Sequence, residues 1–338
     1  MGYPKKDARL VERLQAYMAH KGLDGLAPSG SVFVKDLGLY EKQGLSSKMY
    51  LLKVSTAGGP IEDLMLRLYG NDGKKALREF KILQFLRSKD LPVPRSYDVE
   101  GSGKVLGRPF MIMEKIRETP AEGEHDIVDA AALSLVKVHS IGLGELKGIV
   151  ERKGEYPIWE FNDLKAMIIL SMFLTFRLPI TYAKYWKIVK GLELESKSLR
   201  PSLGLIHGDY GLDNVVYSYG KAYVVDWESA EIAEPTYDVA YACNMLGFGD
   251  DLAMRPKGRL STAFLEAYRR HGGTTRDLEF YKRLAALKLL ILIEILTFPG
   301  LMLLFIRGLS RIVKNSEARL LFGKLREYLL GILEGRRG

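Results

Sequence analysis

Residues 207–214 read His-Gly-Asp-Tyr-Gly-Leu-Asp-Asn, and residues 226–228, after an apolar stretch, read Asp-Trp-Glu. A five-residue step from Asp209 to Asn214 is typical of a phosphoryl-transfer loop, in which the aspartate accepts a proton from an attacking hydroxyl and the asparagine holds a metal ion. Asp226 follows Asn214 by twelve residues, and we expect it to hold Mg²⁺ as well. The alternative is an ordinary glycine-containing loop, with Asp209 solvated and His207 partly in the core.

The segment between Asn214 and Asp226 predicts a β-hairpin. Two short apolar runs, Val215 to Tyr217 and Ala222 to Val225, flank a turn at Tyr219-Gly220. Strands of similar length would return Asn214 and Asp226 to the same end, so that both could share one cation. Phosphoryl transfer needs little from a protein beyond an aligned acceptor and neutralised phosphate charge, so a few short polar side chains suffice.

Together with Pro235-Thr236-Tyr237-Asp238, these motifs resemble the aminoglycoside phosphotransferase and choline kinase family, small-molecule relatives of the protein kinases. The resemblance implies a protein-kinase-like, two-lobed α+β fold with the active site between the lobes. The N-lobe (residues 1–113) would hold about five antiparallel strands and one crossing helix, followed by a hinge (114–117) and a mostly helical C-lobe (118–338).

The resemblance also assigns roles to the motif residues. Asp209 would be the catalytic base, and His207 would belong to the catalytic loop in a supporting role. Asn214 and Asp226 would coordinate magnesium. Asp238 would support the loop from behind; the alternative is a first-turn carboxylate favoured by the helix dipole.

A nucleotide clamp for Mg-ATP or Mg-GTP is implied in the N-terminal third. Ser46 and Ser47 would cover the phosphates, Arg67 would contact them, and Glu79 would orient Arg67. Protein kinases carry Lys at the position of Arg67, and a planar guanidinium changes the phosphate contact in detail. The alternatives are plain turn residues at 46 and 47, a solvent-facing cation at 67 and an exposed helix charge at 79.

The hydrophobic pattern of the N-terminal third agrees with such a nucleotide clamp. We expect a helix over residues 6–22 and an amphipathic helix over 73–89. Residues 95–99 and 108–115 predict a further hairpin leading into the hinge. The adenine would bind beside it, near Glu114.

The composition fits a globular enzyme. The 338 residues, 47% hydrophobic and 27% charged, are ample for two packed cores. A single cysteine, Cys243, excludes a disulfide framework within the chain and is expected in the core. The start lacks an apolar signal segment, which predicts a cytoplasmic protein. Five Asn and three Gln beside many Lys, Arg and Glu suggest the hypothesis of a thermophilic source.

The apolar stretch Leu289–Ile306 raises a membrane question. Glu294 and Pro299-Gly300 interrupt it, whereas a spanning helix needs about 20 mostly apolar residues. We therefore expect two buried helices joined at Pro299-Gly300 and no transmembrane segment. A membrane-associated enzyme acting on a lipid-like alcohol is the alternative.

Charge bears on the phosphate acceptor. The net charge is +9, and residues 250–338 contain seventeen Lys and Arg against nine Asp and Glu, in the region that shapes the acceptor pocket of the related enzymes. Cationic aminoglycosides would favour acidic walls. We therefore expect a small neutral or anionic hydroxyl compound, such as a sugar, a polyol, a nucleoside or a phosphorylated metabolite; the alternative is a solvated basic face without a catalytic role.

Other functions are less well supported. No nucleic-acid recognition motif accompanies the basic clusters, so no nucleic-acid partner is expected. Glu234-Pro235 follows Asp226 by eight residues, too few for the activation segment of a protein kinase. An atypical protein or lipid kinase and an inactive nucleotide-binding scaffold remain the alternatives.

Overall fold

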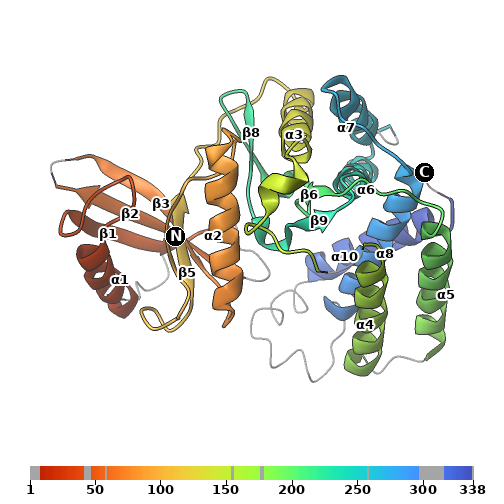
Figure 1. The fold of residues 1–338 in the computed structure, drawn as a ribbon, viewed down its shortest axis with the longest axis horizontal. Helices are drawn as coiled ribbons and strands as arrows, with labels where there is room; N and C mark the ends of the chain where they lie inside the picture. Colours follow the sequence, from red (N-terminus) through yellow and green to blue (C-terminus); the bar gives the residue numbers. More distant parts are fainter. Residues whose placement is uncertain are drawn as a thin grey trace. The chain divides into compact units, whose positions relative to one another are not determined.

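The computed structural model describes residues 8–336 except 42–46, 58, 154–155, 176–178, 257–258 and 297–315. Two compact units are present (Figure 1): an N-terminal unit of Met1–Pro120 with Val216–Glu228, and a C-terminal unit of Ala121–Val215 with Ser229–Gly338. Residues 216–228 thus group with the N-terminal unit although they lie far along the chain. The lobe boundaries at 113 and 118 stay a prediction.

The N-terminal unit contains a five-stranded antiparallel sheet of order β1-β2-β3-β5-β4. Its strands are β1 (Val32–Leu39), β2 (Lys48–Thr56), β3 (Ile61–Leu68), β4 (Ser96–Glu100) and β5 (Phe110–Glu114). Two helices accompany it, α1 (Ala8–Lys21) and α2 (Gly73–Ser88). The expected five strands, the crossing helix and the hairpin before the hinge are all confirmed.

Alternation along β3 determines which groups meet α2. Successive side chains of a strand point to opposite faces, and the leucines of β3 share one face and one core with α1: Leu64, Leu66 and Leu68 pack in a cluster with Leu14 and Met18. Arg67 must therefore point to the other face, where it pairs with Glu79 of α2. The sheet thus delivers a cation to the helix that carries the carboxylate.

The predicted hairpin after residue 214 is also confirmed. Strands β7 (Val215–Ser218) and β8 (Lys221–Val224) pair with each other, and Tyr219 and Gly220 have φ angles of 46° and 76°. Positive φ at both central residues gives a two-residue turn whose twist matches the strands. The N–H of Val224 donates to the carbonyl oxygen of Pro92 at 2.9 Å, which attaches β8 to the N-terminal unit.

The C-terminal unit is mostly helical. Its helices are α3 (Glu124–His139), α4 (Ile158–Thr175), α5 (Pro179–Ser196), α6 (Thr236–Leu252), α7 (Arg259–Arg270), α8 (Leu278–Leu296) and α10 (Ser316–Leu333). Helices α4, α5, α6, α8 and α10 share one apolar core, and α4 and α5 lie side by side in Figure 1. Two short strands, β6 (Gly204–Ile206) and β9 (Glu231–Ala233), pair antiparallel. Cys243 is buried on α6, as expected.

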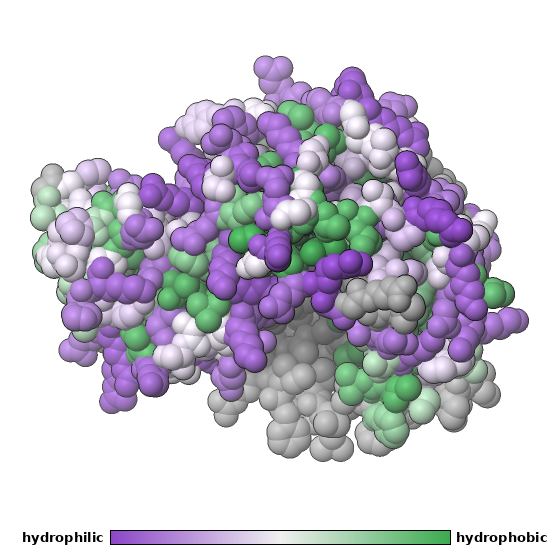
Figure 2. Space-filling model, in the orientation of Figure 1, coloured by the Kyte–Doolittle hydropathy of each residue, from purple (hydrophilic) through white to green (hydrophobic). Residues whose placement is uncertain are grey.

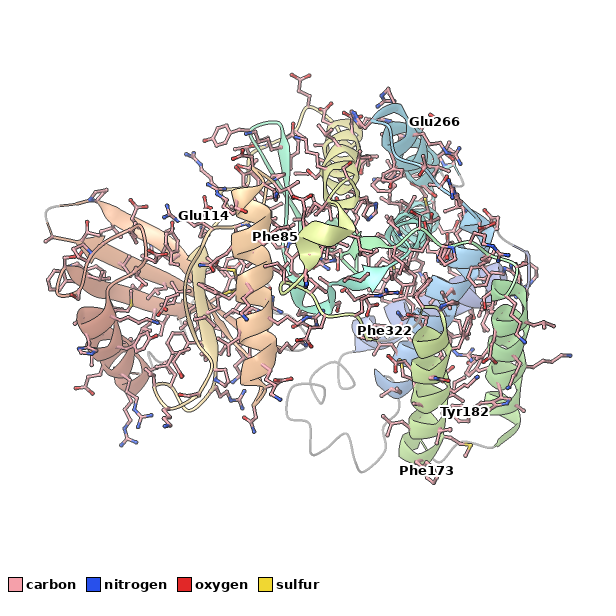
Figure 3. All side chains as sticks on the ribbon, in the orientation of Figure 1. Phe85, Glu114, Phe173, Tyr182, Glu266 and Phe322 are labelled. Atoms are coloured by element: carbon pink, nitrogen blue, oxygen red, sulfur yellow. The ribbon has the colours of Figure 1, made fainter. Side chains whose placement is uncertain are left out.

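The apolar C-terminal stretch is described only in part. Residues 289–296 belong to α8, and the remainder of the Leu289–Ile306 segment, with the proposed joint at Pro299-Gly300, lies outside the described residues. No helix in the described ranges is long and apolar enough to cross a membrane. One end of α4 does expose apolar side chains, including Phe173, which Figure 3 labels in an area coloured as hydrophobic in Figure 2.

Candidate active site

A buried carboxylate holds the loop that follows β6. Asp238, in the first turn of α6, accepts hydrogen bonds from the backbone N–H groups of His207 (2.6 Å) and Gly208 (2.9 Å). Nε2 of His139 lies 3.3 Å from the same carboxylate, and Nδ1 of His139 lies 2.8 Å from the hydroxyl of Tyr268. Asp238 therefore contacts the backbone at residues 207 and 208 from α6, and its role in supporting a catalytic loop stays a prediction.

The loop requires glycine at position 208. Gly208 has a φ of +82°, and a Cβ there would lie 2.5 Å from the backbone oxygen of Ser229. Since a left-handed conformation is costly for other residues and the blocking atom is backbone, a side chain at 208 would displace the loop. The glycine thus lets the chain turn between His207 and Asp209.

Asp209 and Asn214 meet at the other end of this loop. Nδ2 of Asn214 donates to the backbone oxygen of Asp209 at 2.9 Å and lies 3.3 Å from Oδ2 of Asp209. Burial, followed by the charge of Asp209 and a hydrogen bond to it, raises the pKa of Tyr241. Asp209 itself is only half-buried, so a ligand can reach its carboxylate.

His207 is completely buried. Its ring packs edge-on against Tyr210, with ring centroids 5.8 Å apart, and the hydroxyl of Tyr210 donates to the backbone oxygen of Ala131 at 2.7 Å. Such packing is compatible with the supporting role expected of His207, and that role stays a prediction.

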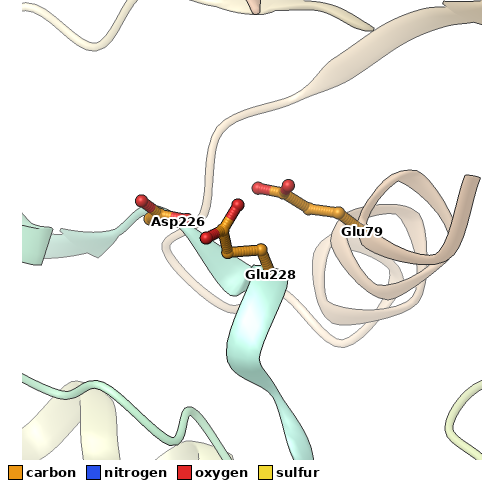
Figure 4. Close-up of side chains that lie close together, drawn as sticks. All are labelled: Glu79, Asp226 and Glu228. Atoms are coloured by element: carbon orange, nitrogen blue, oxygen red, sulfur yellow. The ribbon is translucent and has the colours of Figure 1, made fainter. Parts of the chain in front are cut away.

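In the N-terminal unit, Arg67 binds carboxylates from two segments. Nη1 of Arg67 lies 2.9 Å from Oε1 of Glu79, and Nη2 lies 2.8 Å from Oδ1 of Asp226 and 2.7 Å from Oε2 of Glu228. Figure 4 shows the three acidic side chains converging on one point. The structure thus brings together Arg67, Glu79 and Asp226, three residues selected from the sequence, within this unit.

Burial and the neighbouring charges shift the pKa values of the residues around Arg67. Burial acts to lower the pKa of Arg67, but the charges of Glu79, Asp226 and the other neighbours outweigh it, and the net shift is upward. Burial raises the pKa of Glu79 despite the opposing charge of Arg67. The hydroxyl of Tyr69 donates to Oε2 of Glu79 at 2.7 Å. Arg67 therefore stays charged and fixed in orientation.

Sequence reasoning missed the contribution of Glu228. Besides Arg67, its carboxylate binds Nζ of Lys75 at 3.0 Å. The sequence does carry a signal for Glu228, because Asp226 and Glu228 are two acidic residues two positions apart at the end of a predicted strand. The contribution of Tyr69, two residues beyond Arg67, was also missed.

The remaining predicted nucleotide contacts lie at strand ends. Ser47 directly precedes β2, while Ser46 lies outside the described residues. Glu114 ends β5 (Figure 3), where one of its carboxylate oxygens accepts a hydrogen bond from the N–H of Arg95 at 3.0 Å. The role of these residues in binding a nucleotide stays a prediction.

The polar residues offer suitable ligands for a hard divalent cation. Carboxylate oxygens of Glu79, Asp226 and Glu228 all lie within 4.8 Å of one another. Mg²⁺ prefers oxygen donors and is commonly held by one or two carboxylates together with substrate phosphates. Oxygen donors of this kind suit magnesium, but Arg67 already pairs with all three carboxylates, and the expected binding of magnesium by Asn214 and Asp226 stays a prediction.

Fold and site together define a kinase-like phosphotransferase class, and comparison with known proteins agrees. The sequence profile of the phosphotransferase enzyme family matches residues 42–282, so the chain belongs to that family. An ethanolamine kinase from Plasmodium vivax superposes with a TM-score of 0.67 at 16% identity, covering 98% of this chain and 91% of the other. The predicted family and the kinase-like α+β fold are therefore confirmed.

Two curated relatives match over part of the chain. Aminoglycoside 3′-phosphotransferase from Niallia circulans is 27% identical over 214 residues, which cover 61% of this chain and 76% of that protein. Acyl-CoA dehydrogenase family member 10 from Mus musculus is 27% identical over 192 residues, 49% of this chain. The matched region spans only 16% of that relative's length.

Proposed function

We propose that this chain transfers the γ-phosphoryl group of ATP or GTP to a hydroxyl group of a small molecule. The observation that carries the proposal is the loop around Asp209. A reachable carboxylate sits beside Asn214, and the buried Asp238 fixes the preceding backbone. A general base must be positioned before its pKa matters, and the fixed backbone of this loop supports that role for Asp209.

The reaction balances with the groups at hand. The acceptor oxygen forms a bond to the γ-phosphorus while the bond from that phosphorus to the β,γ-bridging oxygen breaks. Asp209 accepts the proton of the acceptor hydroxyl, and the nucleoside diphosphate leaves with the former bridging oxygen. Asp209 also orients the hydroxyl, which is the larger part of its contribution because phosphoryl transfer depends mainly on alignment.

The other site residues act on the nucleotide. Arg67 contacts its phosphates and is oriented by Glu79, and Ser46, Ser47 and Glu114 complete the contact surface. Magnesium held by Asn214 and Asp226 would neutralise phosphate charge. Support for Arg67 comes from its rigid environment, since a guanidinium held by carboxylates keeps one planar orientation.

For the acceptor, we propose a neutral or anionic compound such as a sugar, a polyol or a related metabolite. Support comes from the excess of basic residues over acidic ones between residues 250 and 338. Such an excess of positive charge would disfavour a polycationic acceptor.

The test is turnover with Asp209→Asn as the key variant. Consumption of Mg-ATP and Mg-GTP is measured against sugars, polyols, nucleosides, amino alcohols and aminoglycosides. The variant should lose at least about 100-fold in kcat while nucleotide affinity stays within about twofold. Asp213→Asn, an exposed charge change in the same loop, is the matched control and should retain activity.

Undiminished turnover in Asp209→Asn would remove the base assignment. Tight nucleotide binding without transfer to any acceptor would favour the inactive scaffold, and transfer only to a lipid or protein would favour the atypical kinase.

A further inference from the structure

A second group of charged residues surrounds the first turn of α6 in the C-terminal unit. We define the Lys288 cluster as Lys153, Glu160, Glu231, Tyr237 and Lys288. Nζ of Lys288 lies 2.8 Å from Oε1 of Glu160 and 4.6 Å from the ring centroid of Tyr237. Nζ of Lys153 lies 2.6 Å from Oε2 of Glu231. Two ion pairs from four separate segments thus converge beside one aromatic ring.

In both ion pairs the carboxylate is more buried than the lysine. Only 3% of the side chain of Glu160 and 6% of that of Glu231 is exposed, against 25% for Lys288 and 47% for Lys153. In each pair the lysine is thus the more exposed partner and the carboxylate the more buried one. The accessible side chains of this cluster are therefore the two lysines, which carry positive charge.

Lys288 keeps that charge. Burial acts to lower its pKa, but Glu160, followed by Tyr237 and Glu231, outweighs burial and the net shift is upward. Replacing a buried ion pair by apolar side chains of similar volume commonly leaves a protein equally stable. Stability alone therefore does not account for the pairing of two buried carboxylates with two lysines.

The cluster adjoins the catalytic loop within the C-terminal unit. Glu231 of β9 pairs with Ile206 of β6, and the next residues are His207, Gly208 and Asp209. On α6, Tyr237 and Tyr241 are separated by one helical turn and share a face. Since Tyr241 interacts with Asp209 and Tyr237 contacts Lys288, one helix face links the base to the ammonium group.

We infer that Lys288 and Lys153 bind an anionic group, a phosphate or a carboxylate, on the acceptor whose hydroxyl Asp209 orients. This inference rests on the proposed function and narrows its neutral or anionic acceptor to an anionic one. Glu160 and Glu231 are positioning residues that hold the two ammonium groups, and Tyr237 supports Lys288 through its ring. Such charge-assisted contacts also discriminate against cationic acceptors.

The first experiment compares matched compounds with the wild-type chain. Glucose, glucuronate and glucose 6-phosphate form one series, and glycerol, glycerate and glycerol 3-phosphate form another. Direct binding is measured by calorimetry and transfer by nucleotide consumption. In at least one series, an anionic member should bind and react at least about tenfold better than its neutral parent; the carboxylate and phosphate arms show which anion is preferred.

The second experiment removes each ammonium group together with its partner carboxylate, so that no buried charge is left unpaired. Glu160→Gln/Lys288→Met removes one pair, and Glu231→Gln/Lys153→Met removes the other. Each should lower affinity and kcat/KM for the anionic compound by about 10- to 100-fold and leave the neutral parent unchanged. Lys288→Arg in the wild-type chain keeps the cation and should therefore retain most of the affinity and kcat/KM for the anionic compound.

Glu279→Gln/Lys282→Met is the control, since it removes another ion pair of α8 with the same zero change in net charge. Equal binding of neutral and anionic members in every series, or equal effects of the Lys288 and Lys282 variants, would overturn the inference. Absence of transfer to all compounds, with anion-selective binding intact, would instead count against the proposed function alone.

Discussion

At the scale of single residues, Asp238 shows how one buried charge can hold the backbone of a loop. Its two oxygens serve two backbone donors, at His207 and Gly208. Asp238→Asn keeps the volume but leaves one acceptor oxygen for two donors. We expect kcat to fall about 10- to 100-fold through misplacement of Asp209, with nucleotide affinity unchanged, as measured by steady-state kinetics and calorimetry.

Asp250 supplies a matched control for that prediction. It is also fully buried on α6, and its Oδ2 accepts a hydrogen bond from the N–H of Leu260 at 2.8 Å. Asp250→Asn should therefore lower the melting temperature to a similar degree without affecting kcat below the transition. If both variants lost activity equally, the effect of Asp238 would be one of stability rather than of position.

A second residue-scale prediction concerns Glu234, which precedes α6. Burial raises its pKa, against hydrogen bonds from Ser202 and Thr236. Since the folded state then holds the proton more tightly than the unfolded state, Glu234 favours folding below its unfolded pKa. That contribution is lost as pH rises toward the raised folded pKa.

A glutamine at position 234 cannot ionise. As the pH rises from about 4.5 toward the raised pKa of Glu234, the melting temperature of Glu234→Gln should therefore fall less than that of the wild type. Glu266→Gln, at an exposed position on α7, should follow the wild-type curve. Parallel curves for all three proteins would show that Glu234 does not titrate differently on folding.

Residue pairs close in sequence were the more predictable ones. The pairing of Arg67 with Glu79 could be predicted because a strand and the helix that follows it place the two side chains on facing surfaces. Contact between Arg67 and Glu228 spans 161 positions, and no local pattern reports it. Nor does amphipathicity show that Glu79 is as buried as the apolar residues of α2.

At the scale of elements, the catalytic loop and the β7–β8 turn both use a glycine with positive φ, but for different reasons. A Cβ added at Gly220 would meet open space, whereas at Gly208 that atom would meet the oxygen of Ser229. Gly220→Ala should therefore cost only about 1 kcal/mol, the cost of the left-handed backbone alone. Gly208→Ala adds a backbone clash.

We expect Gly208→Ala to lower the melting temperature more than Gly220→Ala and to reduce kcat at least about tenfold because the loop must shift. Thermal unfolding and turnover of the two variants provide the comparison. Equal losses in both properties would mean that φ strain, and not contact with Ser229, determines the requirement for glycine.

Elements with a strong local signal were predicted well. The hairpin at Tyr219-Gly220 follows from turn chemistry, and α2 follows from its apolar period. The apolar segment after Leu289 carries an equally strong signal, but hydrophobicity alone does not distinguish a core helix from another buried element. Its first part proved to be the end of α8.

At the scale of the whole molecule, the sequence predicted the fold class through its motifs, because few architectures place such a loop after a short strand. It did not predict that residues 216–228 group with the N-terminal unit. That grouping depends on contacts such as the one between Val224 and Pro92, which long-range packing determines and local patterns do not record. Site residues selected from the sequence consequently belong to both units.

The last prediction concerns the stability of the whole chain. Few Asn and Gln and many charged residues are typical of heat-adapted proteins, in which ion-pair networks gain importance as temperature rises. Such pairs connect α3 to α7 and to residues on either side of it, since Arg255, before α7, pairs with Glu124, and Arg270 and His271, at its end, pair with Asp129. We therefore expect a melting temperature above the mesophile range of about 45–65 °C.

Scanning calorimetry at low and high salt tests the origin of that stability. Exposed pairs contribute little at room temperature, so Arg255→Met/Arg270→Met should leave stability at 25 °C almost unchanged and yet lower the melting temperature by a few degrees. High salt should reduce the difference between variant and wild type, because the two pairs that the variant lacks are screened in the wild type. A wild-type transition at or below about 65 °C would contradict heat adaptation. A high transition that neither salt nor the double variant moves would instead locate the stability in the apolar cores, where added charge screening has no effect.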